Sequence, residues 1–413
     1  NYPPFHYLYR MQRLLNAVFS GITWKCWFTF VVVGMAVGLA SYLFLVFLEM
    51  AQEFGKINSY GYLGLPLFGV FVVMVHYFRY NKEAYTGIND VIKQIHNPVE
   101  KLSYIGASNN LTNTIATHFF GGSVGREGVA VTLAAALADQ FNSLINFSTL
   151  ERKVLLIAAV SAGFGSVFGT PLAGAVFALE FMQLGKLRFK AILPALFCGF
   201  IADYTTTNLG IQHTQYQIGV IPSVGIINLL QMAVAGVAFG GAAWLFIKGM
   251  QYAKFAMNKY VQSPFLKPVV SGILFIGLTL LFGTDYHSLG IPVIERSFLQ
   301  QSDWYVFLLK IVFTVVTLSG GYKGGEATPL FFIGATLGSA LSFVFPLPVG
   351  LLAGAGFIAV FGSATKTPLA SIVIGYELFG WEGLVFFAIA CLVANLITGK
   401  NSVYEGQFIQ QNL

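Results

Sequence analysis

The stretch Gly121-Gly122-Ser123-Val124-Gly125-Arg126-Glu127-Gly128-Val129-Ala130-Val131 governs the interpretation of the rest of the chain. Several glycines and an adjacent Arg–Glu pair come directly before an apolar run that is predicted to be helical. Glycines ahead of a helix let its free N–H groups approach a ligand, and the positive end of the helix dipole favours an anion. An ionisable Glu127 in so apolar a setting is a functional candidate. The stretch therefore indicates an anion pathway with a proton-titratable gate.

The composition is that of a polytopic membrane protein. Of the 413 residues, 56% are hydrophobic and only 10% are charged, whereas soluble domains carry about 25% charged residues. The 45 glycines fit closely packed and interrupted membrane helices. The basic residues are spread between apolar runs, so the contiguous basic surface that a nucleic acid needs is missing. Cys26, Cys198 and Cys391 lie far apart in apolar runs, and we interpret them as buried hydrophobic residues rather than disulfide partners or metal ligands.

Several apolar runs have the length of membrane spans. The run 26–50 is nearly uncharged and exceeds the roughly 20 residues that cross a bilayer, and 60–78 is a second candidate. Glu151-Arg152-Lys153 predicts an exit to water. The run 154–182 is broken by glycines and by Pro171. Such breaks are tolerated at membrane depth only inside protein or beside a watery cavity.

The second half of the chain repeats the landmarks of the first. Three landmarks recur in the same order, with Gly87 echoed by Gly290, Glu127 by Glu326, and Pro171 by Pro368. Two such repeats are predicted to place broken helices around a shared site. We assign them to residues 12–210 and 220–410, and the sequence alone leaves their parallel or inverted orientation open. Glu180 and Glu377 are also equivalent, which favours a symmetric packing or capping role over proton transfer.

At these residues the chain resembles the CLC family of anion channels and proton-coupled exchangers. Gly125-Arg126-Glu127-Gly128 is similar to the family's G-[KR]-E-G-P element, with Val129 in place of proline. Gly325-Glu326-Ala327-Thr328-Pro329 takes the place of G-x-F-x-P, with Ala327 at the phenylalanine. Gly87-Ile88-Asn89-Asp90-Val91 takes the place of G-S-G-I-P, and Ser402-Val403-Tyr404 matches the segment with the family's pore tyrosine. The resemblance covers residues 12 to 410.

This resemblance implies an all-α polytopic membrane protein of the CLC-type fold. Two inverted-topology repeats would bring broken helices together at a midplane anion site. It also implies a homodimer with one pathway per subunit, embedded as a multi-pass protein in the lipid bilayer of the bacterial cytoplasmic (inner) membrane. We expect no cytoplasmic regulatory domain, no cofactor, no metal, no nucleic-acid partner and no enzymatic activity.

Three departures resemble the fluoride-exporting branch of the family. Ile88 stands where chloride-selective members have serine, Val129 follows the glutamate motif, and a Gly-Gly-Glu-x-Thr-Pro element covers 324–329. In addition, Glu180 is followed by Phe181, so the second acidic residue that serves chloride exchangers as an inner proton acceptor looks absent.

The leading hypothesis is therefore a fluoride/proton antiporter that exports fluoride in exchange for proton uptake. A chloride/proton exchanger and a passive anion channel of the same fold are the alternatives. A membrane-embedded enzyme that uses Glu127 and Glu326 as acid and base is a remote alternative, because no nucleophile or metal-ligand cluster accompanies these carboxylates.

Around the first motif, the resemblance implies that the Glu127 carboxylate competes with the anion and leaves the pathway on protonation. Gly125, Gly128 and Val129 belong to the same anion-binding segment. Arg126 is expected to tie down backbone more than to touch the anion, although it belongs to the candidate anion-binding set.

In the second motif, Thr328 is a candidate donor to fluoride, which needs several short donor contacts because it is strongly hydrated. Glu326 could relay a proton while protonated. The resemblance makes Tyr404 an inner donor to the anion. Ile88 would line a position where the anion meets no hydroxyl, and Asn89 supplies either an amide there or a helix cap.

Overall fold

The structure is a computed structural model that describes residues 24–58, 60–79, 86–182 and 191–407. The described residues are mostly helical, and within these ranges the only β-type pairing is a single bridge between Gly125 and Gly325. The α-helices are α2 (Trp24–Ile57), α3 (Leu65–Arg79), α4 (Ile88–His96), α5 (Tyr104–Phe119), α6 (Glu127–Ile145), α7 (Thr149–Phe168), α8 (Pro171–Glu180), α9 (Ile192–Asn208), α10 (Ile226–Tyr260), α11 (Leu266–Phe282), α12 (Ile291–Leu299), α13 (Val306–Ser319), α14 (Ala327–Leu341), α15 (Val349–Thr365), α16 (Pro368–Phe379) and α17 (Leu384–Thr398), with short 3-10 helices η1 (Gly61–Gly64) and η3 (Glu405–Gln407).

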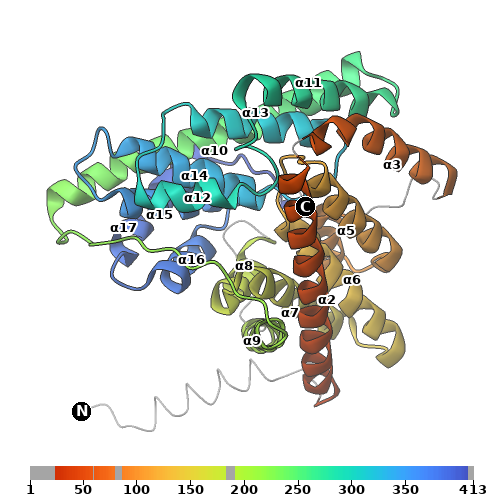
Figure 1. Cartoon of the computed structure of the whole chain (residues 1–413). Helices are drawn as coiled ribbons and strands as arrows, with labels where there is room; N and C mark the ends of the chain where they lie inside the picture. The colour runs from red at the N-terminus through yellow and green to blue at the C-terminus, as the bar shows by residue number, and fades with distance from the viewer. Residues whose placement is uncertain (1–23, 59, 80–85, 183–190, 408–413) are drawn as a thin grey trace, which may run out of the picture.

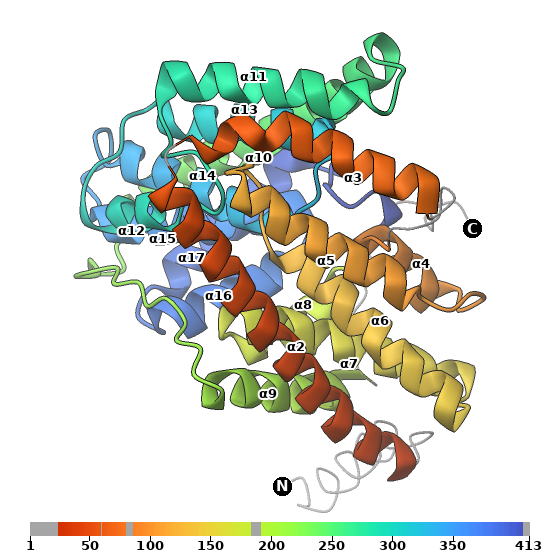
Figure 2. The same cartoon turned by 45° about the vertical axis from the view of Figure 1, so that its right-hand side comes forward.

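The helices fall into two similar sets, α2–α9 and α10–α17 (Figures 1 and 2). Counterparts begin at the repeated motifs, because α4 and α12 follow Gly87 and Gly290, and α8 and α16 start at Pro171 and Pro368. Equivalent helices also lie side by side, as α3 does with α11 and α8 with α16. The predicted repeat limits at 12 and 410 lie outside the described residues.

The pair α8 and α16 is joined by reciprocal caps. Both helices begin with proline, which suits the first helical position because its missing N–H would be unpaired there anyway. Glu377 near the end of α16 accepts bonds of 2.9 and 2.8 Å from the first amides of α8, and Glu180 at the end of α8 accepts bonds of 3.1 and 2.8 Å from those of α16. The donors are Leu172, Ala173, Leu369 and Ala370. The capping role predicted for the two glutamates is confirmed, and the reciprocity is that of halves related by a two-fold rotation.

Within the described residues, three helices are long and apolar enough to cross a membrane: Lys25–Ile57, Glu127–Ile145 and Ile226–Tyr260. The predicted span 26–50 lies inside the first of them. The second candidate, 60–78, instead becomes η1 followed by the shorter α3. Large apolar side chains on α2, such as Phe28, are exposed, as expected of a face that contacts lipid.

The centre of the protein is formed by α7 and α15, which are buried along nearly their whole length. Small residues let α14 pack directly against α15. A Cβ added at Gly334 of α14 would lie 2.0 Å from the carbonyl oxygen of Gly356, and one at Gly338 would lie 2.0 Å from that of Leu352. These close contacts fix the position of α14, whose N-terminus forms part of the site below.

The prediction that Glu151-Arg152-Lys153 marks an exit to water is wrong. These residues form the first turn of α7, and the first two are buried. Arg152 makes two bonds to the Asp139 carboxylate, at 2.7 and 2.8 Å, and Glu151 completes a capping box with Ser148. Charged residues can enter a membrane protein's interior when each has a partner, and here the partners come from α6 and from the helix N-terminus.

Candidate anion pathway

Two glycine turns bring the N-termini of α6 and α14 together. The turn after α5 contains Gly121 with φ of 76°, and the equivalent turn after α13 contains Gly321 with φ of 92°. Only glycine adopts this left-handed region at no steric cost. Each turn leads to one member of the backbone bridge: the Gly125 amide donates to the Gly325 carbonyl at 2.6 Å, and the Gly325 amide donates back at 2.8 Å. The amide ends of the two helices therefore start side by side.

The Glu127 carboxylate occupies the N-terminus of α14, the helix of the opposite half. One oxygen accepts a bond of 3.1 Å from the Thr328 amide and another of 3.1 Å from the Arg126 amide. The other oxygen accepts from the Thr328 hydroxyl. Glu127 is only 1% exposed. A carboxylate held by amides, a hydroxyl and a helix N-terminus occupies a site that would equally suit a free anion.

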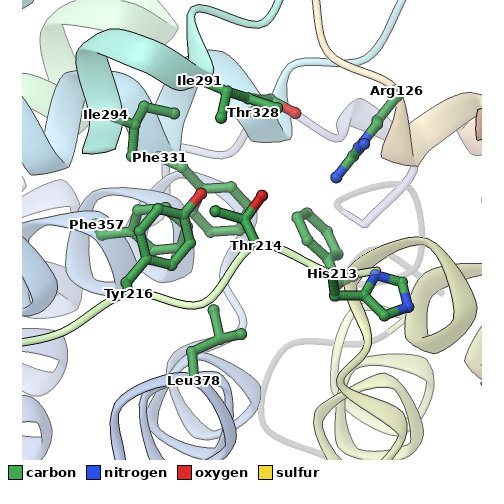
Figure 3. A pocket seen from close by; sticks show the side chains of 11 residues that line it. Arg126, His213, Thr214, Tyr216, Ile291, Ile294, Thr328, Phe331, Phe357 and Leu378 are labelled. Carbon is green, nitrogen blue, oxygen red and sulfur yellow. The ribbon is translucent and has the colours of Figure 1, made fainter. Parts of the chain in front are cut away.

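Arg126 lies beside this carboxylate. Its Nε atom is 3.7 Å from a Glu127 oxygen, and it makes no hydrogen bond among the described residues. The guanidinium lines a cavity of about 30 Å³ that we call the gate pocket, together with Thr328, Thr214 and Tyr216. Figure 3 shows the guanidinium and the three hydroxyls turned toward the same space. A pocket of this size holds about one water-sized particle.

A larger cavity of about 530 Å³, the vestibule, leads to the gate pocket, and the two share Arg126, His213, Thr214 and Ile291. Further lining residues include Glu49, Glu53, Lys56, Gln212 and Glu295. Burial lowers the pKa of His213, in the linker between α9 and α10, to about 4. His213 is therefore neutral at neutral pH, which leaves Arg126 as the cation where the vestibule meets the gate pocket.

The linker residues His213, Thr214 and Tyr216 were missed as site residues. The sequence shows them only as a polar stretch between two apolar runs. The signal that could have found them is the length of that stretch, because polar residues with no helix of their own have to lie at a water-filled surface or cavity.

Glu326 requires a correction in register. The sequence match aligned it with Glu127, but the bridge pairs Gly125 with Gly325, so Glu326 is the counterpart of Arg126. Each of these two residues is the N-cap of its helix, and neither makes a side-chain capping bond. Matching the two glutamates by identity therefore shifted the second repeat by one residue relative to the pairing of Gly125 with Gly325. The two glutamates thus hold different positions around the same junction.

Tyr404, Ile88 and Asn89 form a second group at the N-terminus of α4. Tyr404 is buried and meets the Phe181 ring edge-on at 6.4 Å. Asn89 accepts a bond of 3.1 Å from the Gly406 amide, so its side-chain carbonyl is used to hold the Tyr404 segment. The helix cap is Gly87 and not Asn89.

Gly128 and Val129, the remaining predicted anion-binding residues, have different surroundings. Gly128 lies against Gly325, with a Cβ distance of 3.6 Å to its Cα atom, so any side chain there would approach the bridge. The side chain of Val129 belongs instead to a small apolar cluster with Phe44 and Leu45. Only the backbone of Val129 can therefore face an anion.

The donors that hold the Glu127 carboxylate are of the kind that can also bind a free anion. Protonation would remove the charge of Glu127 and weaken its three acceptor contacts, which frees the same donors for another anion. No group of three His, Cys, Asp or Glu side chains in the described ranges could hold a metal ion.

Comparison with known proteins settles the family. A sequence profile described as voltage gated chloride channel matches residues 69–399. The chain belongs to this family, the CLC family. A relative from Pseudomonas syringae pv. tomato, named chloride/fluoride channel protein, is 39% identical over 91% of this chain and 84% of its own length.

Solved CLC structures confirm the fold. The crystal structure of a CLC-type fluoride/proton antiporter superposes with a TM-score of 0.89 and 33% identity, and covers 94% of this chain and 99% of that one. A slow cyanobacterial Cl⁻/H⁺ antiporter has a TM-score of 0.79 at 18% identity, covering 92% of this chain and 95% of that one, and shows the fold alone. The expectation of a multi-pass, all-α CLC fold is confirmed.

Proposed function

We propose that this protein is a fluoride/proton antiporter in which Glu127 is the proton-titratable gate. One observation carries the proposal. The Glu127 carboxylate accepts hydrogen bonds from the amide and the hydroxyl of Thr328, and one of its oxygens lies 3.7 Å from Nε of Arg126. The names of two relatives, a chloride/fluoride channel and a fluoride/proton antiporter, support the choice of substrate.

The proposed cycle follows from the competition between two anions for one set of donors. While ionised, Glu127 fills the N-terminus of α14 and closes the pathway. A proton neutralises the carboxylate, which then gives up its contacts and leaves the donors to fluoride. Because the gate opens only when protonated, transport of the anion is tied to movement of protons.

Fluoride is favoured by the kind of donor that the gate provides. A small, strongly hydrated anion must regain short hydrogen bonds when it leaves water. Thr328 offers an amide and a hydroxyl at one place, and Arg126 adds a charge. At the N-terminus of α4, Ile88 has no hydroxyl. A larger, more weakly hydrated anion such as chloride would therefore lose water there without gaining a hydrogen bond from this side chain.

We also propose roles for Glu326 and Tyr404, an oligomeric state and a membrane location. Glu326, the N-cap of α14, relays protons, and Tyr404 donates to the anion at the second group. The protein works as a homodimer with one pathway per subunit in the bacterial cytoplasmic membrane. Exposed apolar side chains such as Trp244 and Leu396 support a location surrounded by lipid or by a second copy.

The test is fluoride and chloride efflux from proteoliposomes, with internal pH followed, for the wild type and for Glu127→Gln. An outward fluoride gradient should drive protons inward in the wild type, and the variant should lose this coupling. Glu382→Gln, which changes an exposed carboxylate away from the gate, is the matched control and should keep coupled transport.

A passive channel is the second candidate, because the Pseudomonas relative is named a channel. Fast fluoride flux without proton movement in the wild type would establish it and refute the antiporter. A preference for chloride, with protons still coupled, would instead support a chloride/proton exchanger.

A further inference from the structure

A buried chain of hydrogen bonds centred on Gln407 holds the segment that carries Tyr404. Gln407 lies in η3 and is only 3% exposed. Its Nε2 atom donates to the carbonyl of Phe181 at 2.6 Å and to that of Thr365 at 2.9 Å. Its Oε1 atom accepts from the Ser402 hydroxyl at 2.6 Å. The side chain therefore bonds three parts of the fold that are separate in the sequence.

The chemistry of the groups fixes the direction of each of these bonds. Carbonyl oxygens can only accept, so the NH₂ side of the Gln407 amide has to face Phe181 and Thr365. The amide oxygen then needs a donor, which is the Ser402 hydroxyl. The same hydroxyl oxygen accepts from the Tyr404 amide at 3.0 Å. The bonds thus run in one direction, from the backbone of Tyr404 to the two carbonyls.

The two carbonyls that Gln407 bonds belong to opposite halves of the protein. Phe181 is the C-cap of α8 in the first half, and Thr365 is the last residue of α15 in the second. The last carbonyls of a helix have no partner within that helix, and a buried carbonyl without a partner is costly. One glutamine side chain therefore satisfies a helix end from each half and fixes the Tyr404 segment to both.

Two further bonds hold the backbone on either side of Tyr404. The Val403 amide donates to the carbonyl of Ala364 in α15 at 2.9 Å. The Gly406 amide donates to the side chain of Asn89 in α4 at 3.1 Å. The segment is therefore bonded to α4, α8 and α15, which are the helices around the Tyr404 ring.

The hydroxyl of Tyr404 is the part of this segment that is left to bind a ligand. Its amide donates to Ser402, and its carbonyl accepts from the Gln407 amide at 3.2 Å. The residue is only 4% exposed, and within the described part of the chain its hydroxyl makes no hydrogen bond. The hydroxyl of a buried tyrosine usually has a partner. An anion at this place would supply the missing acceptor.

We propose that Gln407 is a positioning residue that sets the place of the Tyr404 hydroxyl relative to both halves, and thereby the affinity for the anion that this hydroxyl binds. The inference rests on the proposed function, in which Tyr404 donates to the anion. Gln407 does not touch the anion, because the bonds above use both its amide hydrogens and its amide oxygen. A small, strongly hydrated anion depends most on a short donor contact. A displaced hydroxyl therefore weakens fluoride binding more than chloride binding.

The first test removes the amide and keeps the length of the side chain. Gln407→Met offers no N–H to the two helix-end carbonyls. The fluoride concentration that gives half-maximal transport should rise roughly tenfold, as expected when a hydrogen bond to an anion is lost. The ratio of fluoride flux to chloride flux should fall. Gln301→Met, which changes an exposed glutamine between α12 and α13, is the matched control and should leave both quantities unchanged.

A double-mutant cycle asks whether Gln407 acts through the Tyr404 hydroxyl. Tyr404→Phe has lost this hydroxyl, so Gln407→Met should change the half-maximal fluoride concentration much less in that background than in the wild type. A glutamine that only stabilises the fold would have the same effect in both backgrounds. Equal factors in the two backgrounds would overturn the proposal.

Ser402→Ala breaks the same chain at its other link and does not depend on the folding of the glutamine variant. The two helix-end carbonyls keep their donor in Gln407, and only the bonds through the Ser402 hydroxyl are lost. We expect a change in the same direction as in Gln407→Met but smaller, and again only while the Tyr404 hydroxyl is present. An unchanged fluoride dependence together with an unchanged flux ratio would overturn the proposal.

The antiport and the role of Gln407 fail in different ways. If wild-type fluoride flux moves no protons, the antiport is wrong, but the fluoride dependence of the Gln407 and Tyr404 variants is still measured in the same assay. If protons are coupled and Tyr404→Phe has the fluoride dependence of the wild type, the antiport stands and the proposed role of Gln407 is wrong.

Discussion

Gly125 and Gly325 exchange two backbone hydrogen bonds, of 2.6 and 2.8 Å, and so join the two halves of the protein at the gate itself. The bridge leaves no room for side chains at either position. A Cβ at Gly125 would lie 2.9 Å from a Glu127 oxygen and 3.0 Å from the Thr328 amide. The position of Glu127 relative to the N-terminus of α14 is thus set by one pair of peptides.

Gly325→Ala should disable transport. The added Cβ would lie 3.0 Å from the Gly128 amide nitrogen and 3.4 Å from that of Glu127, and backbone atoms cannot move aside as a flexible side chain can. We expect a loss of about 1–3 kcal/mol in stability from overpacking, together with loss of fluoride flux. Thermal unfolding in detergent and the efflux assay measure the two effects. Gly241→Ala, with no neighbour within 4 Å of the new Cβ in the middle of α10, is the control and should be neutral or slightly stabilising. Normal flux in the Gly325 variant would contradict a rigid bridge.

Thr328→Val should slow fluoride transport more than chloride transport. The substitution keeps the shape of the side chain but removes the hydroxyl that donates to Glu127 in the closed gate. A hydrogen bond to a charged group is worth about 1.5–3 kcal/mol, or roughly tenfold to a hundredfold in affinity. Fluoride and chloride flux, measured side by side, give the ratio. Thr328→Ser retains the hydroxyl and should stay near the wild type. An unchanged ratio in the valine variant would remove Thr328 from the anion site.

Transport should accelerate as the pH falls, and only while Glu127 is present. Protonation takes the carboxylate off the α14 N-terminus, so acidification increases the fraction of open gates until the protonation step no longer limits turnover. Glu127→Ala has no group to protonate there, and its fluoride flux should be independent of pH over the same range. The comparison needs only fluoride efflux at matched internal and external pH. A pH dependence that survives in Glu127→Ala would assign titration to another residue.

Asp139→Asn should destabilise the fold severely. Arg152 is buried with Asp139, and the lost carboxylate would leave its guanidinium without a counter-charge. Breaking a buried pair in this way costs about 3–5 kcal/mol. Asp285→Asn removes one member of an exposed pair with the same 2.7 Å separation, and should cost less than about 1 kcal/mol. Melting temperatures in detergent distinguish the two. Similar losses of melting temperature in both variants would show that burial does not decide how much an ion pair contributes to stability.

Local signals in the sequence predicted the positions of the repeated elements. Glycines before α6 and α14 and prolines at the start of α8 and α16 act within a few residues, so their effect is readable without a fold. The duplicated Glu180 and Glu377 likewise pointed to a symmetric contact. These features follow from backbone conformation and from free helix ends, which the sequence carries directly.

Features that depend on a partner in another element were not predictable. The burial of Arg152 depends on Asp139 in the preceding helix, and the sequence shows only a cluster of charges. The register of Glu326 depends on which peptides pair, and a match of identical letters places it one residue off. The place of Thr214 at the gate pocket depends on a cavity formed by several helices. Each is a property of packing between separate elements, which local patterns in the sequence do not show.

The reciprocal caps of α8 and α16 bear on how the protein is made. The amides at the start of α8 receive their acceptor from Glu377, which the ribosome adds about two hundred residues later. Until then α8 lies in or near the bilayer with an unsatisfied end, a state that hydrocarbon penalises by several kcal/mol per group. The first half therefore cannot finish folding during its own synthesis. A gene fragment that encodes it alone should yield a product that cellular proteases degrade, and co-expression of the second half as a separate chain should rescue it.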